Sequence, residues 1–448
     1  MTNIVPEQVK PDNARDHEEE ELQILREKAV KALQSVPCYF SRLPVELQKE
    51  MFSVVIDCSN AKTLALTHVC RSWRDLIVGT SRFWQNLTIT PRTELKKADT
   101  WLGRSKGTLT DLHIVGVLSR GYQSRFFRNA ASTIWSSLDT LAITTPSEDI
   151  FSALPLTAAN KLRLRKLEVY SEKLSIESLK ALTKMDSSRI RHFTLKTTCE
   201  VIQITGFTFT SLTTLILSAS HSDGGLFLLL KQNPMLENLI LESPSTAAPY
   251  HSEGVEDLEL GNLIRLELVK SVHTHICLKR IRFPNLKTLV VTNYIGVGTP
   301  VLIDEQELTH LEHLTLSTFI HYHTPSLISI LQRATALKTL EIPRCFFQYG
   351  GENTVVEALA EGSMCPKLQH LDLSGYRTLK AGPVIRLVEA HLSRAANVTS
   401  SDGHVDQPLP ILSLSLDDCP MISSNQLARL RGMVPHVSWR MPKLGVRV

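Results

Sequence analysis

The sequence predicts an α/β protein in which a small all-helical unit is followed by a solenoid with parallel strands inside and helices outside. Two observations predict this fold. One short apolar template recurs through most of the 448 residues, and three short helical patterns precede its first copy. The composition, 43% hydrophobic and 21% charged, is that of a folded globular chain.

Residues 1–20 form the first element of the predicted fold. They are polar, contain two prolines and end in an acidic run. Such a segment has too few apolar side chains to form a packed core, so we expect a disordered acidic tail. Within residues 21–40, apolar side chains fall three or four positions apart from Leu22 to Val36, which predicts a single N-terminal helix.

Residues 41–87 contain the three short helical patterns. Pro44 suits the first turn of the first helix, where its missing N–H group costs nothing, and Leu47 and Met51 then share one face. The third pattern, residues 69–77, carries an apolar stripe of its own. Three helices this short form too small a hydrophobic core to be stable alone, so we expect the unit to contact a partner.

The template aliphatic-x-x-Leu-x-aliphatic occurs twelve times between residues 109 and 416. Eleven of the copies have Leu at the central position, and successive copies begin 22 to 31 residues apart, except for a last interval of 43. Each copy alternates apolar and polar residues like a strand with one buried face, and helical patterns lie between several copies. A strand and a helix in each repeat are typical of a leucine-rich-repeat solenoid.

We expect this solenoid to span residues 88–448 with about twelve repeats. Weaker copies of the template at residues 84 and 434 are candidates for its two ends. The long last interval is rich in polar and small residues and predicts an exposed loop near residues 393–410. Cys345 and Cys419 lie three residues past a template copy, where such repeats place a side chain that faces the backbone turn.

The polar residues between the apolar template positions point away from the core, because side chains alternate along a strand. Their charges are mixed, without a long basic stripe or an aromatic platform, so we expect an unknown target protein and no nucleic acid as the ligand. The candidate target-binding residues are Lys166, Glu168, Tyr170, His192, Lys196, Glu242, Arg265, Glu267, His313, Glu341, His370, Asp372 and Asp417.

Three motifs in the helical unit resemble a known pattern. They are LPVELQKEMF, VCRSWRDLI and FWQNL, which begin at residues 43, 69 and 83. In order and spacing they resemble the F-box, and an F-box followed by leucine-rich repeats is a known architecture. The resemblance implies that the unit docks on the adaptor subunit of an SCF-type, cullin-based ubiquitin ligase. The repeats of such a substrate receptor bind the protein to be ubiquitylated, and catalysis belongs to other subunits.

The resemblance also assigns residues to the adaptor contact. These adaptor-binding candidates are Leu43, Pro44, Leu47, Met51, Val69, Cys70, Trp73 and Trp84. Gln48 departs from the pattern, because the family usually has Leu at this position. That departure keeps an alternative open, in which the chain is a non-ligase leucine-rich-repeat scaffold with a divergent F-box.

We expect no catalytic site, no cofactor and no metal site. The segment GRSKGT at residue 103 has Lys and Gly in the wrong order for a phosphate loop, and the Ser, His and Asp of SASHSDGG at 218 are sequence neighbours, whereas a triad converges from distant segments. No apolar run approaches the roughly 18 residues of a membrane span, and the N-terminus does not resemble a secretory signal. The eight cysteines are scattered without a C-x-x-C pair, which indicates a reducing compartment, the cytoplasm or the nucleus.

Overall fold

The described part of the chain divides into two compact units, residues 1–79 and 80–448. The computed structural model describes residues 23–24, 28, 39–56, 60–129, 135–146, 150, 154, 163–172, 174, 188–197, 209–218, 223–242, 257–269, 278–292, 308–318, 320–322, 324–347, 351–361, 364–398 and 409–441. The expected tail, residues 1–20, lies outside these ranges, as does most of the expected helix within 21–40.

The first unit is helical. It contains the 3-10 helix η1 (Tyr39–Arg42) and the α-helices α2 (Val45–Ile56), α3 (Asn60–Thr67) and α4 (Arg71–Gly79). Helix α3 packs against both α2 and α4. Phe52 and Ile56 of α2 and Ile77 of α4 are buried and form the small core of the unit. The unit ends at Gly79, so residues 80–87 of the expected 41–87 domain belong to the second unit.

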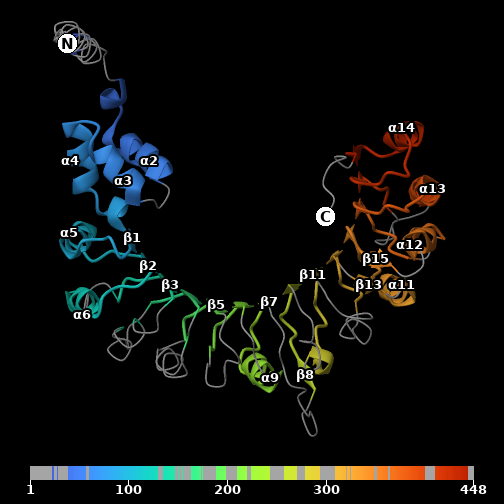
Figure 1. Cartoon of the computed structure of the whole chain (residues 1–448), viewed down its shortest axis with the longest axis horizontal. Coiled ribbons are helices and arrows are strands. Elements are labelled where there is room, and N and C mark those ends of the chain that lie inside the picture. Colours follow the sequence, from blue (N-terminus) through green and yellow to red (C-terminus); the bar gives the residue numbers. More distant parts are fainter. Residues whose placement is uncertain are drawn as a thin grey trace, which may run out of the picture. The chain divides into compact units, whose positions relative to one another are not determined.

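The second unit is built on one sheet of 14 strands (Figure 1). Its first seven strands are β1 (Asn86–Ile89), β2 (Asp111–Val115), β3 (Thr140–Thr145), β4 (Lys166–Ser171), β5 (His192–Thr197), β6 (Thr214–Ser218) and β7 (Asn238–Glu242). The other seven are β9 (Arg265–Val269), β11 (Thr288–Thr292), β12 (His313–Ser317), β14 (Thr339–Glu341), β16 (His370–Asp372), β17 (Ser413–Ser415) and β18 (His436–Ser438).

All neighbouring strands of this sheet are parallel and follow each other in chain order. The twelve template copies form the twelve inner strands, and the weaker copies at residues 84 and 434 form the outer strands β1 and β18. The central template leucines, such as Leu141 and Leu215, are fully buried. The fold is the predicted leucine-rich-repeat solenoid.

Helices lie along one face of the sheet (Figure 1). They are α5 (Leu95–Ser105), α6 (Arg120–Asn129), α9 (Asp223–Lys231), α11 (Thr324–Arg333), α12 (Gly351–Ala360), α13 (Ala381–Val398) and α14 (Ser424–Met433), with short 3-10 helices η2 (Ser81–Trp84) and η4 (Leu278–Arg280). Because α13 continues to Val398, residues 393–398 of the expected loop are helical, and residues 399–408 lie outside the described ranges. Where the chain is described, none of the helices combines the length and the apolar character that a bilayer span requires.

Two further pairs of short parallel strands form small sheets separate from the main one. They are β8 (Leu258–Glu259) with β10 (Ile281–Arg282), and β13 (Ile320–Tyr322) with β15 (Phe346–Phe347). The turns that follow the template also have the expected chemistry. The thiol of Cys345 donates to the carbonyl of Leu316 at 3.1 Å, and the thiol of Cys419 donates to that of Leu373 at 3.2 Å. Both cysteines are buried and satisfy backbone carbonyls of the preceding repeat, Leu316 within β12 and Leu373 just after β16.

Candidate protein-interaction surfaces

The helical unit exposes an apolar face on α2. Leu47, Met51 and Val54 are four and three positions apart, so they lie on one side of the helix, and their exposed fractions are 52%, 49% and 80%. The opposite side of α2 carries the buried Phe52 and Ile56. Exposed large apolar side chains are concentrated in this unit: six of the fourteen in the described residues lie between residues 45 and 69. A contiguous exposed patch of this kind is typical of a protein-binding site.

The VCRSWRDLI motif adopts a different local structure from the one expected. Helix α4 begins at Arg71, so Val69 and Cys70 lie in the turn before it and do not share a helical face with Trp73. The backbone N–H of Trp73 donates to the sulfur of Cys70 at 3.5 Å, which caps the first turn of the helix. Val69 and Cys70 are exposed, and Leu43 and Pro44 are half-buried and exposed respectively.

Trp73 belongs mainly to the core of the helical unit. Its ring lies 4.8 Å from that of Phe52 and 4.9 Å from that of Phe40, measured between centroids. The side chain is half-buried, so part of its surface remains accessible. Trp73 therefore supports the fold of the unit and can contribute only part of its surface to a partner.

The position of Trp84 differs from the adaptor contact expected for the last motif. Its side chain is 0% exposed, and it lies in the second unit, where it packs edge-on against Trp101 with 4.5 Å between the ring centroids. The guanidinium carbon of Arg104 lies 4.5 Å from the Trp84 ring centroid. A side chain enclosed in this way is not accessible to an adaptor, and its role is to close the first repeat of the solenoid.

Gln48, the departure from the F-box pattern, has a defined place in the fold. Its side chain is buried, and its amide nitrogen donates to the carbonyl of Leu43 at 2.7 Å. The bond satisfies a carbonyl just before α2, where the chain turns into the helix. The polar residue therefore stabilises this turn and does not interrupt the exposed face formed by Leu47, Met51 and Val54.

The face of the sheet opposite the helices carries the target-binding candidates. Lys166, Glu168 and Tyr170 lie on β4; His192 and Lys196 on β5; Glu242 on β7; Arg265 and Glu267 on β9; His313 on β12; Glu341 on β14; His370 and Asp372 on β16; and Asp417 two residues after β17. Along most of these strands buried and half-buried residues alternate, as the template predicts. The sheet thus brings the candidates together on one surface.

Many of these charges neutralise each other along and across the strands. Lys166 contacts Glu168 at 2.9 Å, and Arg265 contacts Glu267 at 2.8 Å. Lys196 on β5 reaches across β6 to Glu242 on β7, with N–O distances of 3.0 and 3.1 Å. These half-exposed pairs contribute little stability, roughly 0–1 kcal/mol each, and a partner can rearrange them at small cost.

Two candidate groups have shifted pKa values. Partial burial, followed by the charge of Lys166, lowers the pKa of His192, so the imidazole is neutral at physiological pH. Partial burial, and then the nearby Glu168 carboxylate, raises the pKa of Tyr170. Both groups therefore present neutral polar atoms to a ligand. In the described ranges no three or more His, Cys, Asp or Glu side chains are grouped so that they could hold a metal ion.

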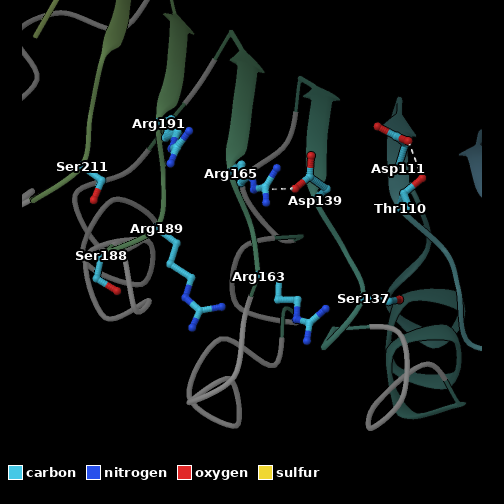
Figure 2. A pocket seen from close by; sticks show the side chains of 10 residues that line it. All are labelled: Thr110, Asp111, Ser137, Asp139, Arg163, Arg165, Ser188, Arg189, Arg191 and Ser211. Carbon is cyan, nitrogen blue, oxygen red and sulfur yellow. Dashed lines mark hydrogen bonds and ion pairs between the residues drawn. The ribbon is translucent and has the colours of Figure 1, made fainter.

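A hollow of about 750 Å³ lies where the chain leads into strands β2 to β6, and polar residues line it (Figure 2). Its lining consists of Thr110, Asp111, Ser137, Asp139, Arg163, Arg165, Ser188, Arg189, Arg191 and Ser211. The backbone holds this region firmly: the amides of Arg165 and Lys166 both donate to the Asp139 carbonyl, at 2.9 and 3.0 Å, and the next repeat has the same arrangement. We call this hollow the arginine pocket.

The arginine pocket was not expected from the sequence. The alternation predicts the surface position only of residues within each strand, whereas Arg165 and Arg191 occupy the second template position, just before the strands, and Arg163 and Arg189 precede the template. A signal is nevertheless present, because consecutive repeats contain Arg-Leu-Arg at 163–165 and Arg-Ile-Arg at 189–191, each beginning one residue before its template copy. Aligning the repeats by position, and comparing the residues between them, would have found it.

No protein-family model matches the sequence, and no curated protein matches it. Two solved structures to which the chain is similar are the yeast complex of Rad7 and Elc1 and the TLR13–ssRNA13 complex. The first has 13% identity and a TM-score of 0.41 and covers 96% of this chain and 98% of that one. The second has 16% identity and a TM-score of 0.42 and covers 75% and 42%. At these TM-scores neither similarity carries an argument about function.

Proposed function

We propose that the chain is a non-catalytic substrate receptor of an SCF-type, cullin-based ubiquitin ligase. In this proposal the helical unit docks on the adaptor subunit, and through it on the cullin, while the sheet face of the solenoid binds a target protein. The receptor acts in the cytoplasm or the nucleus. The observation that carries the proposal is the exposed apolar face of α2 within a segment whose motifs resemble the F-box.

The energetics of the exposed face support the adaptor contact. Complete burial of a fully exposed side chain of this kind contributes roughly 1.5–3 kcal/mol. Leu47 and Met51 are about half exposed and Val54 is 80% exposed, so covering them recovers half or more of that amount at each position. Pro44 and Val69, which are also exposed, lie in the two segments that carry the F-box motifs. A small helical unit gains most from a partner that covers this face.

The solenoid supports the second half of the proposal. Its polar face combines acidic, basic and aromatic side chains over many strands, which suits an extended protein surface. The charge pairs on this face, such as Lys196 with Glu242, can exchange partners when a target binds.

The alternative, a scaffold with a divergent F-box, rested on Gln48. Because the Gln48 amide is buried and bonded to the Leu43 carbonyl, this residue does not alter the exposed face directly. The scaffold therefore remains as an outcome of the experiment below and is not a second proposal.

The experiment places charges on the exposed face. We expect Leu47→Asp with Met51→Asp to reduce the capture of purified adaptor and cullin by the full chain at least tenfold, because burying unpaired carboxylates in an apolar interface costs several kcal/mol, roughly 2 or more. Both side chains are about half exposed in the free chain, so the fold should tolerate the change. Circular dichroism and thermal unfolding check that it does.

The matched control is Leu228→Asp with Met421→Asp. These residues are similarly exposed apolar side chains on the solenoid, so the control adds the same charge elsewhere and should leave adaptor capture unchanged. If the folded double variant on α2 still recovers adaptor and cullin at the wild-type yield, the adaptor contact has been assigned to the wrong face. If the wild-type chain recovers no adaptor at all, the ligase proposal fails and the scaffold interpretation replaces it.

A further inference from the structure

The four arginines of the arginine pocket are matched in position across two neighbouring repeats. Residue 166 of β4 pairs with residue 192 of β5, so Arg165 stands beside Arg191 and Arg163 beside Arg189. Neighbouring strands lie about 4.8 Å apart, and the two pairs are therefore stacked closely. Figure 2 shows the side chains of Arg163 and Arg189 extending in the same direction from the segments that lead into the strands.

Two carboxylates, Asp111 and Asp139, line the pocket beside the four arginines, and among the described residues only one arginine forms an ion pair. Arg165 contacts Asp139 at 3.3 Å, and its side chain is still 67% exposed. Within the described ranges, the guanidinium groups of Arg163, Arg189 and Arg191 form no ion pair or hydrogen bond, and all three residues are exposed. The like charges of Arg163, Arg189 and Arg191 repel each other, so an anion that binds between them gains both attraction and relief of repulsion.

The basic region is narrow. The residue just before the strand can be compared across five neighbouring repeats. From β3 to β7 it is Asp139, Arg165, Arg191, Thr213 and Glu237, so an acidic residue stands on each side of the two arginines. A nucleic-acid backbone, which carries a charge at every nucleotide, would have to pass these carboxylates. The charge pattern instead fits one compact anion about two strands wide.

The remaining lining identifies the kind of anion. Ser211 adds a hydroxyl donor, and arginine side chains bind phosphate oxygens through paired N–H groups. A phosphate monoester has about two negative charges and three acceptor oxygens, and so uses such a set of donors better than a carboxylate does.

The shape of the pocket favours a phosphate that is attached to a protein. Pockets for small molecules enclose most of their ligand with apolar walls, whereas none of the ten lining residues is apolar and the arginines are exposed. Lys166 and His192, the first residues of β4 and β5, continue from the pocket onto the proposed target-binding face. A peptide whose phosphate lies among the arginines can therefore extend along that face.

We propose that the arginine pocket binds a phosphorylated side chain of the target protein, so that target binding depends on phosphorylation. This inference rests on the proposed role of the repeats in target binding. It does not depend on the adaptor contact, because the arginines and the exposed face of α2 belong to different units of the chain.

The experiment uses the full chain immobilised at physiological salt. The probes are a degenerate peptide library centred on phosphoserine, the same library with unmodified serine, inositol hexakisphosphate and single-stranded RNA. We expect retention of the phosphoserine library to exceed that of the serine library at least tenfold and to fall when inorganic phosphate is added. The variant Arg163→Gln with Arg189→Gln should reduce it to the level of the serine library. Arg431→Gln with Arg440→Gln removes two exposed arginines elsewhere and should change nothing.

Each contrary outcome overturns the assignment. Equal retention of the two libraries, or retention that Arg163→Gln with Arg189→Gln leaves unchanged, removes the phosphate site. Binding of inositol hexakisphosphate without binding of phosphopeptides means a small polyphosphate ligand, and equal binding of RNA means a nucleic-acid ligand.

Adaptor capture is measured on the same proteins. A chain that binds phosphopeptides but no adaptor refutes the ligase role alone, and a chain that captures adaptor without phosphate-dependent binding refutes the pocket alone.

Discussion

The substitution Trp84→Ala separates a structural role of this residue from a role in adaptor binding. Trp84 is 0% exposed, and truncating a fully buried Trp typically costs about 3–5 kcal/mol. The edge-on contact with Trp101 accounts for about 0.5–1.5 kcal/mol of such a loss, and the Arg104 guanidinium over the ring adds a contribution of similar size. The bond from the Trp101 indole N–H to the Trp84 carbonyl involves the backbone and can survive the substitution.

The loss should be local. Repeats of a solenoid contact mainly their neighbours, so weakening the first repeat releases that end before the rest unfolds. We expect hydrogen exchange in β1, β2 and α5 to accelerate by a factor of roughly 100 or more, the equivalent of about 3 kcal/mol, while β11 to β17 keep their protection. Adaptor capture should remain at the wild-type level, because Trp84 lies outside the helical unit.

The matched variant for this experiment is Trp73→Ala, which removes a half-buried Trp from the helical unit itself. It should reduce adaptor capture and leave the exchange of β1 and β2 unchanged. The reasoning is refuted if Trp84→Ala keeps the wild-type exchange pattern but loses the adaptor, because Trp84 would then be a contact residue after all.

Two further predictions concern titration and thiol reactivity. Burial, and then the charge of Arg394, lowers the pKa of His391 from 6.5 to about 4. Between pH 6.5 and 4, His391 is protonated in the unfolded chain and neutral in the folded chain. The free energy of unfolding should therefore fall by at most about 3 kcal/mol as the pH is lowered from 6.5 to 4. Urea unfolding of His391→Gln should lack this part of the pH dependence; a parallel dependence in both proteins would contradict the assignment. Burial raises the pKa of Cys365 to about 12 and that of Cys419 to about 11. Iodoacetamide at pH 8 should therefore label the exposed Cys70 at least roughly tenfold faster than either, as peptide mass spectrometry would show, and comparable rates in the native protein would disprove the burial.

The strands could be predicted from the sequence because one local rule determines each of them. An apolar residue at every second position is needed to bury one face, and Leu141, Leu215 and their equivalents satisfy that rule in repeat after repeat. The cysteines after the template were predictable for the same reason, since a buried backbone carbonyl of the preceding repeat needs a small donor at a fixed position.

The positions of Trp84 and of the Val69–Cys70 turn could not be predicted in this way. A large apolar residue is equally suited to a core and to an interface, and only the contacts of Trp84 with Trp101 decide between them. The start of α4 depends on competing local bonds. Arg74 donates to the Thr67 carbonyl at 2.9 Å, and Cys70 accepts from Trp73, so the chain turns before the helix begins. The arginine pocket required the alignment of whole repeats in space.

The residue-for-residue pairing of the parallel strands makes the sheet surface a grid. Each position before or within a strand forms a line that crosses all repeats, as Arg165 and Arg191 do next to Asp139. Inserting or deleting one complete repeat would shift every later repeat along the grid by one strand spacing, about 4.8 Å, and leave its own pattern intact. The distance between the arginine pocket and any other contact on the face can therefore change in fixed steps. Duplication of a single repeat would fit the face to a target whose binding segments are spaced one step further apart.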